Sequence, residues 1–281
     1  MTETILVDRS GPVAAITFNR PERHNAFNTT LIREVVAELR SIAADPAVRV
    51  VLLRGAGRSF SAGADLEEML DQGSLGARRV ALQWIEMFEL LETIPQPVVA
   101  SVHGHAIAGG TELTLACDLV IAADDSRFGL TEAQVGVIPG AGASARLSRW
   151  VGRAAAKQIL MLGEVFPAQE AHRLGLVNWL VPRDELESAT EALCAKLASR
   201  SPIALAAVKR VVDRTTEMEL RGAIQYALQE FALVFAGPDQ REGMAAFLEK
   251  RAPQFTGFAA APPAAAAPAA APSTPSQETA P

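Results

Sequence analysis

The sequence predicts an α/β fold, and three observations lead to this class. Over residues 1–198, short apolar runs typical of strands alternate with longer segments that repeat apolar residues at helical spacing. Helical patterns alone follow, and the chain ends in a segment composed almost wholly of alanine, proline, serine and threonine. We therefore expect a core over residues 1–198, a helical segment over 199–258 and a disordered tail over 259–281.

The apolar runs and their flanking turns give the expected elements in order. The expected strands are Ile5–Asp8, Val13–Asn19, Val48–Leu53, Pro97–Val102 and Leu119–Ala122. The expected helices of the core are Leu31–Ala44, which ends at Asp45-Pro46, and Val80–Ile94. After Val181-Pro182 the expected helices are Glu185–Ser199, Ile203–Thr215, Glu217–Phe235 and Gln240–Lys250.

Composition and charge exclude several classes of protein. The 281 residues are 49% hydrophobic, which is enough for a sizeable core, and the net charge of -6 disfavours a nucleic-acid binder or an anionic-membrane binder. The N-terminus has neither a basic leader nor an apolar signal region, so we expect a cytoplasmic address and no membrane association. Cys117 and Cys194 lie in apolar helical patterns and are expected to be reduced structural thiols.

Two glycine-bearing turns with two glutamates downstream of them indicate the chemistry. The turns Ser61–Asp65 and Ala108–Gly110 each follow an apolar run and precede a helical pattern, so each can direct an unpaired backbone N–H at a substrate oxygen. Glu112 falls in a first helical turn and Glu132 in a loop-like stretch. If the two carboxyls converge on one water, one can take its proton while the other gives a proton to carbon.

Longer motifs around these residues carry a resemblance to a known family. The motifs are Pro21–Phe27, Ser59–Leu66, Gly104–Leu113, Phe128–Glu132 and Gly136–Gly142. Their order and spacing resemble those of the enoyl-CoA hydratase/isomerase (crotonase) family, and the likeness runs from about Ile5 to Phe255. Within the family the chain is most similar to the enoyl-CoA hydratases, because both glutamates of the hydratase pair are retained.

This resemblance implies a fold, a substrate class and a reaction. The implied fold is a crotonase-like spiral of ββα units with a C-terminal helical segment that forms homotrimers, often paired into hexamers. The implied substrate is an acyl-CoA thioester, with no metal and no cofactor beyond the coenzyme A of the substrate. The implied reaction is addition of water to a 2-enoyl-CoA to give a 3-hydroxyacyl-CoA. The alternatives are an enoyl-CoA isomerase or a specialised hydratase for branched or aromatic acyl groups.

Residue roles carry over by position. Ala64 and Gly109 resemble the oxyanion-hole residues, and Glu112 and Glu132 resemble the catalytic pair. The positions implied to bind substrate are Ala26, Ala62, Asp65, Leu66 and Gly110, with Arg23, Lys250 and Arg251 as candidate partners of the coenzyme A phosphates. The chain departs from the family at Ala108, where glycine is frequent, and at Glu67, where some hydratases carry lysine.

Other readings of the sequence lead to other classes. Gly140–Ala145 fits the G-x-G-x-x-A pattern of a nicotinamide-dependent oxidoreductase, but Pro139 interrupts the segment before it. His103-x-His105 would suggest a metal site, yet no third ligand is evident nearby. An RNA-binding module rests on analogy with one family member alone. Lys209-Arg210 is interpreted as a solvated helix face.

Overall fold

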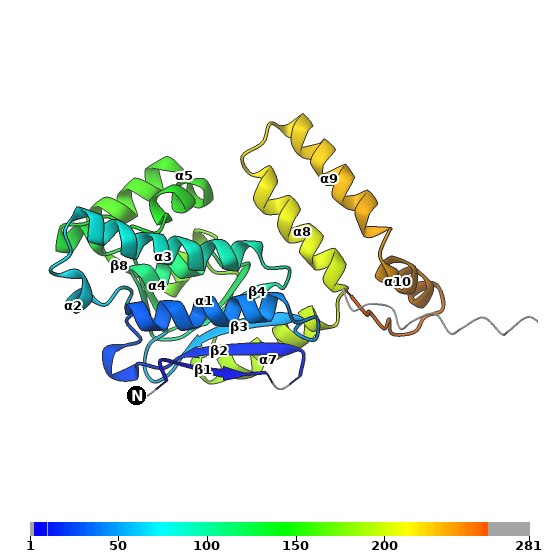
Figure 1. Ribbon diagram of the computed structural model, residues 1–281, viewed down its shortest axis with the longest axis horizontal. Coiled ribbons are helices and arrows are strands. Elements are labelled where there is room, and N and C mark those ends of the chain that lie inside the picture. The colour runs from blue at the N-terminus through cyan, green and yellow to red at the C-terminus, as the bar shows by residue number, and fades with distance from the viewer. Residues whose placement is uncertain (1–2, 10, 258–281) are drawn as a thin grey trace, which may run out of the picture.

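A six-stranded sheet lies at the centre of the computed structural model, which describes residues 3–9 and 11–257 (Figure 1). Its strands stand in the order β1-β2-β3-β4-β6-β9, with β1 antiparallel to β2 and the other neighbours parallel. Their bounds are β1 Ile5–Asp8, β2 Val13–Phe18, β3 Val50–Gly55, β4 Val98–Val102, β6 Leu119–Ala123 and β9 Trp179–Val181. A second sheet contains β5 His105–Ile107, β7 Arg127–Gly129 and β8 Val165–Pro167.

Helices connect the strands and continue beyond the last of them. The helices of the core are α1 Thr29–Ala43, α2 Leu66–Met69, α3 Ser74–Thr93, α4 Gly109–Leu115, α5 Ala143–Leu162, α6 Ala168–Arg173 and α7 Leu186–Ala198. Three short 3-10 helices are η1 Pro21–Arg23, η2 Glu132–Val135 and η3 Arg183–Glu185. The last three helices, α8 Pro202–Thr215, α9 Leu220–Val234 and α10 Pro238–Leu248, form what we call the C-terminal arm.

Residues that alternate along the central strands face two hydrophobic clusters. In β3, Val51 and Leu53 join the larger cluster with α1 and α3, whereas Val50 and Leu52 join the smaller cluster with α7. Helices therefore cover both faces of the sheet, with α1 and α3 on one side and α7 on the other (Figure 1). Burial on both faces explains why the strand segments read as continuous apolar runs rather than as alternating ones.

Backbone hydrogen bonds stack the turns beyond the strands into successive layers. Phe27 N donates to Gly63 O (2.7 Å), and Ile107 N donates to Ser61 O (2.9 Å). The next layer is reached through β5, which pairs with β7 in parallel. The turns that contain the two glycine motifs are thereby held side by side, although they are more than forty residues apart in the sequence.

The expected elements agree with the structure to within a few residues, apart from α3. This helix begins at Ser74, several residues before the expected start at Val80. Its first turns contain two consecutive arginines, Arg78 and Arg79, and Leu75 is 77% exposed, so no apolar stripe marks them in the sequence. The expected tail over 259–281 lies outside the described residues. Within the part of the chain that the structure describes, no helix is long and apolar enough to cross a membrane.

The C-terminal arm projects away from the sheet, and a buried ion pair fixes its first helix (Figure 1). Lys209 of α8 is 8% exposed; its Nζ donates to Asp118 Oδ2 (2.8 Å) and to the carbonyl oxygens of Leu91 and Gln96. The interpretation of Lys209 as part of a solvated face is therefore wrong. A lysine can lie inside when its three donors all find acceptors, and a single sequence does not reveal those acceptors.

Candidate active site

The first turn of the site ends at Ala64, whose backbone N–H has no acceptor among the described residues. The bridge between Phe27 and Ala64 consists of two hydrogen bonds: Phe27 N donates to Gly63 O, and Asp65 N donates to Phe27 O (2.9 Å). Neither bond uses the N–H of Ala64 itself. Gly63 has a φ of +90°, a conformation that side chains with a Cβ rarely adopt. The Ala64 N–H is thus left available to a ligand.

Buried polar side chains hold this first turn. Asn25 is fully buried and donates to Ser59 O (2.7 Å), while its Oδ1 accepts from Arg20 N (2.9 Å). Arg20 forms an ion pair with Asp65 (2.9 Å), and Asp65 also caps α2 by accepting from Glu67 N (3.2 Å). The carboxylate of Asp65, a position expected to bind substrate, therefore contacts protein groups that support the turn.

The second turn joins β5 to α4 and leaves Gly109 at the first helical position. Ala108, the residue before it, has φ 49° and ψ −121°, which is a strained conformation for alanine. Ala108 N donates to Gly129 O (2.7 Å), whereas the Gly109 N–H has no acceptor among the described residues. Gly109 therefore presents an unpaired N–H at the positive end of α4.

Glycines allow the two turns to touch. A Cβ added to Gly63 would lie 2.8 Å from the Gly109 nitrogen, and one added to Gly110 would lie 2.5 Å from the carbonyl oxygen of Ser61. A Cβ at Gly109 would lie 2.6 Å from Cη2 of Trp84. The structure thus brings the turn that contains Ala64 against the turn that contains Gly109 and Gly110.

Trp84 closes the far side of the second turn. Its indole is 4% exposed and packs against Phe27, with ring centroids 4.9 Å apart, and edge-on to Phe88 at 5.6 Å. The sequence places Trp84 on the buried stripe of its helix but does not indicate that it contacts Gly109. That contact depends on the crossing of α3 over α4, which no local pattern encodes.

Glu112 lies in the first turn of α4 and is 5% exposed. Its Oε1 accepts from the backbone N–H groups of Ala141 (3.2 Å) and Ala143 (3.0 Å). Burial raises the pKa of Glu112 to about 7; the charge of Glu132 adds to the rise, while the two N–H groups and the Arg146 guanidinium oppose it. Near neutral pH this carboxyl is poised between its two protonation states.

Glu132 is the first residue of η2 and is 9% exposed. Burial raises the pKa of its carboxyl, and Oε2 has no hydrogen-bond partner among the described residues. Because the charge of Glu132 raises the pKa of Glu112, the two carboxyls lie within electrostatic reach of each other. Both carboxyls are buried, and they lie at the two ends of the segment 132–143, because Glu132 begins η2 and the Glu112 carboxylate accepts from the N–H groups of Ala141 and Ala143.

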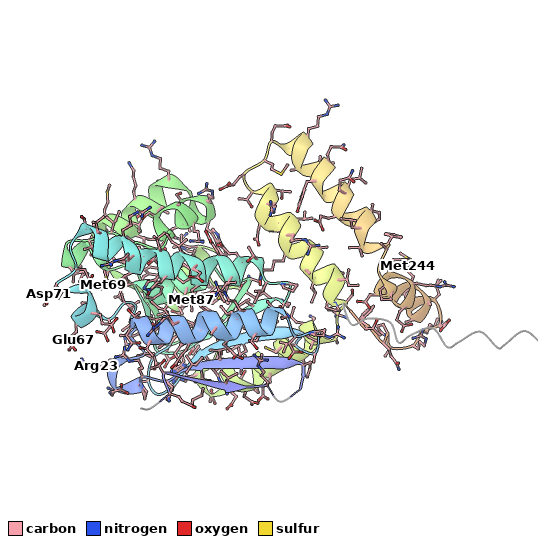
Figure 2. All side chains as sticks on the ribbon, viewed as in Figure 1. Arg23, Glu67, Met69, Asp71, Met87 and Met244 are labelled. Atoms are coloured by element: carbon pink, nitrogen blue, oxygen red, sulfur yellow. The ribbon has the colours of Figure 1, made fainter. Side chains whose placement is uncertain are left out.

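The remaining substrate-binding predictions fall on the rim of the first turn. Ala26 and Ala62 lie in the paired turns, half-buried, and Leu66 opens α2 with 59% of its surface exposed. Arg23 donates to Glu67 through both terminal nitrogens (2.7 and 3.1 Å), as their positions in Figure 2 illustrate. The guanidinium is thus already paired with Glu67, a position at which the sequence departs from the family pattern that it resembles.

Two predicted phosphate partners lie elsewhere in the chain. Lys250 and Arg251 follow α10, and Figure 2 shows Met244 of that helix on the opposite side of the molecule from Arg23. Arg251 pairs with Glu242 (2.6 Å). Within one chain the structure does not bring Lys250 and Arg251 to the turns of the site.

The geometry bears on two alternative readings. The segment 136–142, which precedes α5, is not a strand, and the N–H groups of Ala141 and Ala143 already bind the Glu112 carboxylate. A dinucleotide fingerprint needs a strand before its glycines and free N–H groups after them. Among the described residues no group of three or more His, Cys, Asp or Glu side chains is arranged to hold a metal ion.

Comparison with known proteins identifies the family. The family model described as "Enoyl-CoA hydratase/isomerase" matches residues 8–258. The 2,3-dehydroadipyl-CoA hydratase of Escherichia coli K12 is 39% identical over 257 residues, and the crotonyl-CoA hydratase of Syntrophomonas wolfei is 36% identical over 254; each match covers 90% of this chain and 98% of the relative.

A solved structure extends the likeness to the whole fold. The crystal structure of an enoyl-CoA hydratase from Bacillus anthracis matches with a TM-score of 0.87 at 38% identity, covering 90% of this chain and 99% of that one. The predicted α/β crotonase-like fold with C-terminal helices is confirmed. This chain belongs to the enoyl-CoA hydratase/isomerase family.

Proposed function

We propose that this chain is an enoyl-CoA hydratase, an enzyme that adds water to a 2-enoyl-CoA thioester and gives a 3-hydroxyacyl-CoA. The observation that carries the proposal is the pair of buried carboxyls, Glu112 and Glu132, beside the unpaired N–H groups of Ala64 and Gly109. Relatives named as hydratases of crotonyl-CoA and of 2,3-dehydroadipyl-CoA support it. We propose further that the enzyme works in the cytoplasm.

The two N–H groups would hold the thioester oxygen. As water adds at the β-carbon, negative charge develops on this oxygen, and donors that are fixed beforehand stabilise it without reorganisation. Loss of one such donor costs roughly 10²–10³-fold in rate. In this role Ala64 and Gly109 act through their backbone N–H groups, and a Cβ added to Gly109 would lie 2.6 Å from Trp84.

The carboxyls would divide the proton transfers. Glu112, with a pKa of about 7, takes a proton from the water as its oxygen bonds to the β-carbon. Glu132, whose pKa is also raised by burial, gives a proton to the α-carbon. One O–H bond of water and the π bond of the C=C double bond break, and one C–O and one C–H bond form, so no electrons are exchanged with a cofactor. We therefore propose that no metal or further cofactor takes part.

The C-terminal arm supports a proposal of trimers, alone or paired into hexamers. Its exposed apolar side chains include Leu220, Ile224, Leu228, Phe231, Leu233, Phe247 and Leu248. A surface of this composition needs a partner in water. In such an assembly, Lys250 and Arg251 would bind coenzyme A phosphates at the site of a neighbouring subunit.

An isotope experiment separates hydration from double-bond migration. The purified chain is incubated with crotonyl-CoA in water enriched in oxygen-18, and in parallel with a 3-enoyl-CoA, and the products are identified by mass spectrometry. The proposal predicts a 3-hydroxyacyl-CoA that carries one oxygen-18 at carbon 3. Conversion of the 3-enoyl-CoA to its 2-enoyl isomer without any hydroxyacyl product would instead establish the isomerase alternative.

A further inference from the structure

Arg146 of α5 connects two helices and a loop through one guanidinium group. Its Nε and Nη2 donate to the two carboxylate oxygens of Glu92 on α3 (2.5 and 2.9 Å), and its Nη1 donates to Ala141 O (2.8 Å). The guanidinium carbon lies 5.7 Å from the ring centroid of Phe88 on the same helix α3. Each nitrogen of this planar group thus donates one hydrogen bond, and one face of the group lies over an aromatic ring.

The loop before α5 is shaped around this guanidinium. Gly142 has a φ of +102°, and a Cβ there would lie 2.6 Å from Nη1 of Arg146. The backbone closes the same turn, since Arg146 N donates to Gly142 O (2.9 Å). The side chain of Arg146 thus binds the carbonyl of Ala141, and its backbone N–H binds the carbonyl of the next residue, Gly142.

The opposite side of this loop binds the proposed base. Glu112 Oε1 accepts from the N–H groups of Ala141 and Ala143, which flank the carbonyl that Arg146 holds. Because a peptide unit is planar, the hydrogen bond to the Ala141 carbonyl fixes the plane of the Ala141–Gly142 peptide, which links the two peptides that carry these N–H groups. The position of the carboxylate then depends on a side chain that does not touch it.

We propose that Arg146 is a positioning residue for hydration: by anchoring the loop 140–143 to Glu92, it holds the two N–H groups that aim the Glu112 carboxylate at the attacking water. The proposal rests on the proposed function, in which Glu112 is the base. Misplacement of a reacting group by about 1 Å can cost 10²-fold in rate. The effect of losing the anchor should therefore appear in kcat rather than in KM.

The charges around the carboxylate allow geometry to be separated from electrostatics. Glu112 faces Glu132 on η2 and Arg146 on α5, and Arg146 in turn faces Glu92 and Glu89 on α3. Arg146→Lys keeps the positive charge, but a single ammonium group cannot reach both Glu92 and the Ala141 carbonyl. Arg146→Gln removes both the charge and the bidentate hydrogen bonding of the guanidinium. Glu92→Gln keeps Arg146 but removes its anionic partner.

The experiment compares these three variants with Arg149→Gln as a matched control. Arg149 lies one turn further along α5 and forms an exposed ion pair with Glu217 (2.7 Å), so its loss removes an equivalent charge away from the loop. The measurements are kcat and KM for crotonyl-CoA, thermal unfolding at one pH, and NMR titration of the Glu112 carboxyl carbon in substrate-free protein. The carboxyl resonance is assigned by its loss in Glu112→Gln.

The three variants should all lower kcat, but they should shift the pKa of Glu112 in different directions. Both Arg146 variants should lose about 10-fold or more in kcat with KM within about twofold, and Arg149→Gln should retain both values. The pKa of Glu112 should rise in Arg146→Gln, rise less in Arg146→Lys, and fall in Glu92→Gln. Glu92→Gln should also lose kcat, because it loosens the anchor while leaving the fold less perturbed.

Two results would overturn the proposal. One is a kcat of Arg146→Gln within twofold of the unmodified chain at a temperature where both are folded. The other is an unchanged Glu112 titration in both Arg146→Gln and Glu92→Gln. If the unmodified chain fails to hydrate crotonyl-CoA, the proposed function is refuted, while the titration still decides whether Arg146 controls the Glu112 carboxylate.

Discussion

A Cβ on Gly63 would lie 2.8 Å from the backbone nitrogen of Gly109, so the two turns of the site touch where their unpaired N–H groups begin. The Ala64 N–H follows Gly63 directly in the chain. The spacing between the two donors is therefore set by backbone packing before any substrate arrives. Such preorganisation is the condition under which donors stabilise a developing negative charge most.

Gly109→Ala should disturb this spacing through Trp84. The new methyl group would lie 2.6 Å from the indole, which Phe27 and Phe88 hold in place, so the start of α4 has to move. We expect kcat for crotonyl-CoA to fall by about 10²-fold, the cost of losing one aligned donor. Steady-state kinetics measure this loss.

Trp84→Phe supplies the control. The smaller ring of phenylalanine frees space at the clash. The double variant Gly109→Ala with Trp84→Phe should therefore reverse at least half of the increase in activation free energy that Gly109→Ala causes. Trp84→Phe alone should reduce kcat only slightly, because Gly109 keeps its place. Equal activity in Gly109→Ala with and without Trp84→Phe would show that the indole does not set the donor position.

Glu112 should make the stability of the protein depend on pH. Its pKa is 4.5 in an exposed reference state and about 7 in the fold, so the folded chain binds the proton more tightly. Between these values the folded state holds more protons than the unfolded one, and stability falls as pH rises. The loss amounts to roughly 3 kcal/mol between pH 4.5 and 7.

Glu112→Gln removes this dependence. Denaturant unfolding followed from pH 4.5 to 7.5 should show a smaller decline for the variant, which becomes the more stable protein at the upper end of the range. Glu86→Gln, an exposed glutamate paired with Arg40, should keep the slope of the unmodified chain. Parallel curves for Glu112→Gln and the unmodified chain would contradict the burial of an ionisable base.

Ala108→Gly should stabilise the fold. Ala108 has φ 49° and ψ −121°, a conformation that costs alanine roughly 1–3 kcal/mol and glycine little. Part of the gain is offset by the greater freedom of glycine in the unfolded chain. We expect a net gain of roughly 1 kcal/mol, a rise in Tm of about 2–4 °C, with activity retained. A lower Tm would show that the Ala108 methyl group contributes packing that outweighs the strain.

Much of the fold could be predicted from local sequence patterns. The features that could not be predicted lack such a local pattern. The strand β3 was predicted because Val48–Leu53 is a continuous apolar run, a pattern typical of a strand buried on both faces. The start of α3 was not predicted because its first turns carry no buried large apolar side chain. The interpretation of Lys209 as solvated was wrong because the groups that accept its hydrogen bonds, Leu91 and Asp118, lie far away in the sequence.

Part of the candidate site, like part of the fold, could be predicted from the sequence. Glycines in short turns between an apolar run and a helical pattern, and a glutamate in a first helical turn, leave local signals, so Gly63, Gly109 and Glu112 could be singled out. Arg146 leaves no such signal, because a helical arginine after a glycine-rich loop is ordinarily solvated. Its role depends on Glu92, a residue 54 positions earlier.

Glu67 should weaken the binding of coenzyme A phosphates if Arg23 is one of their partners. The carboxylate of Glu67 occupies both terminal nitrogens of Arg23. Glu67→Gln should therefore lower KM for crotonyl-CoA by roughly twofold to fivefold, the size expected for exposed charges. The kinetics are measured at low ionic strength, where such charges are least screened.

Arg23→Gln is the opposing variant, and salt is the internal control. It should raise KM by a similar factor, and both effects should shrink as ionic strength increases, while Glu86→Gln leaves KM unchanged. A KM that responds to neither Arg23→Gln nor Glu67→Gln would remove Arg23 from the phosphate site. It would leave the proposed proton transfers untouched.

The central claim is that Glu112 and Glu132 act together on water beside the two backbone donors. The most direct measurement is the loss of absorbance of the conjugated thioester when crotonyl-CoA is mixed with the unmodified chain, with Glu112→Gln and with Glu132→Gln. The unmodified chain should hydrate the substrate, and each variant should lose at least about 10²-fold in kcat with KM changed little. Full activity in either variant would contradict the account.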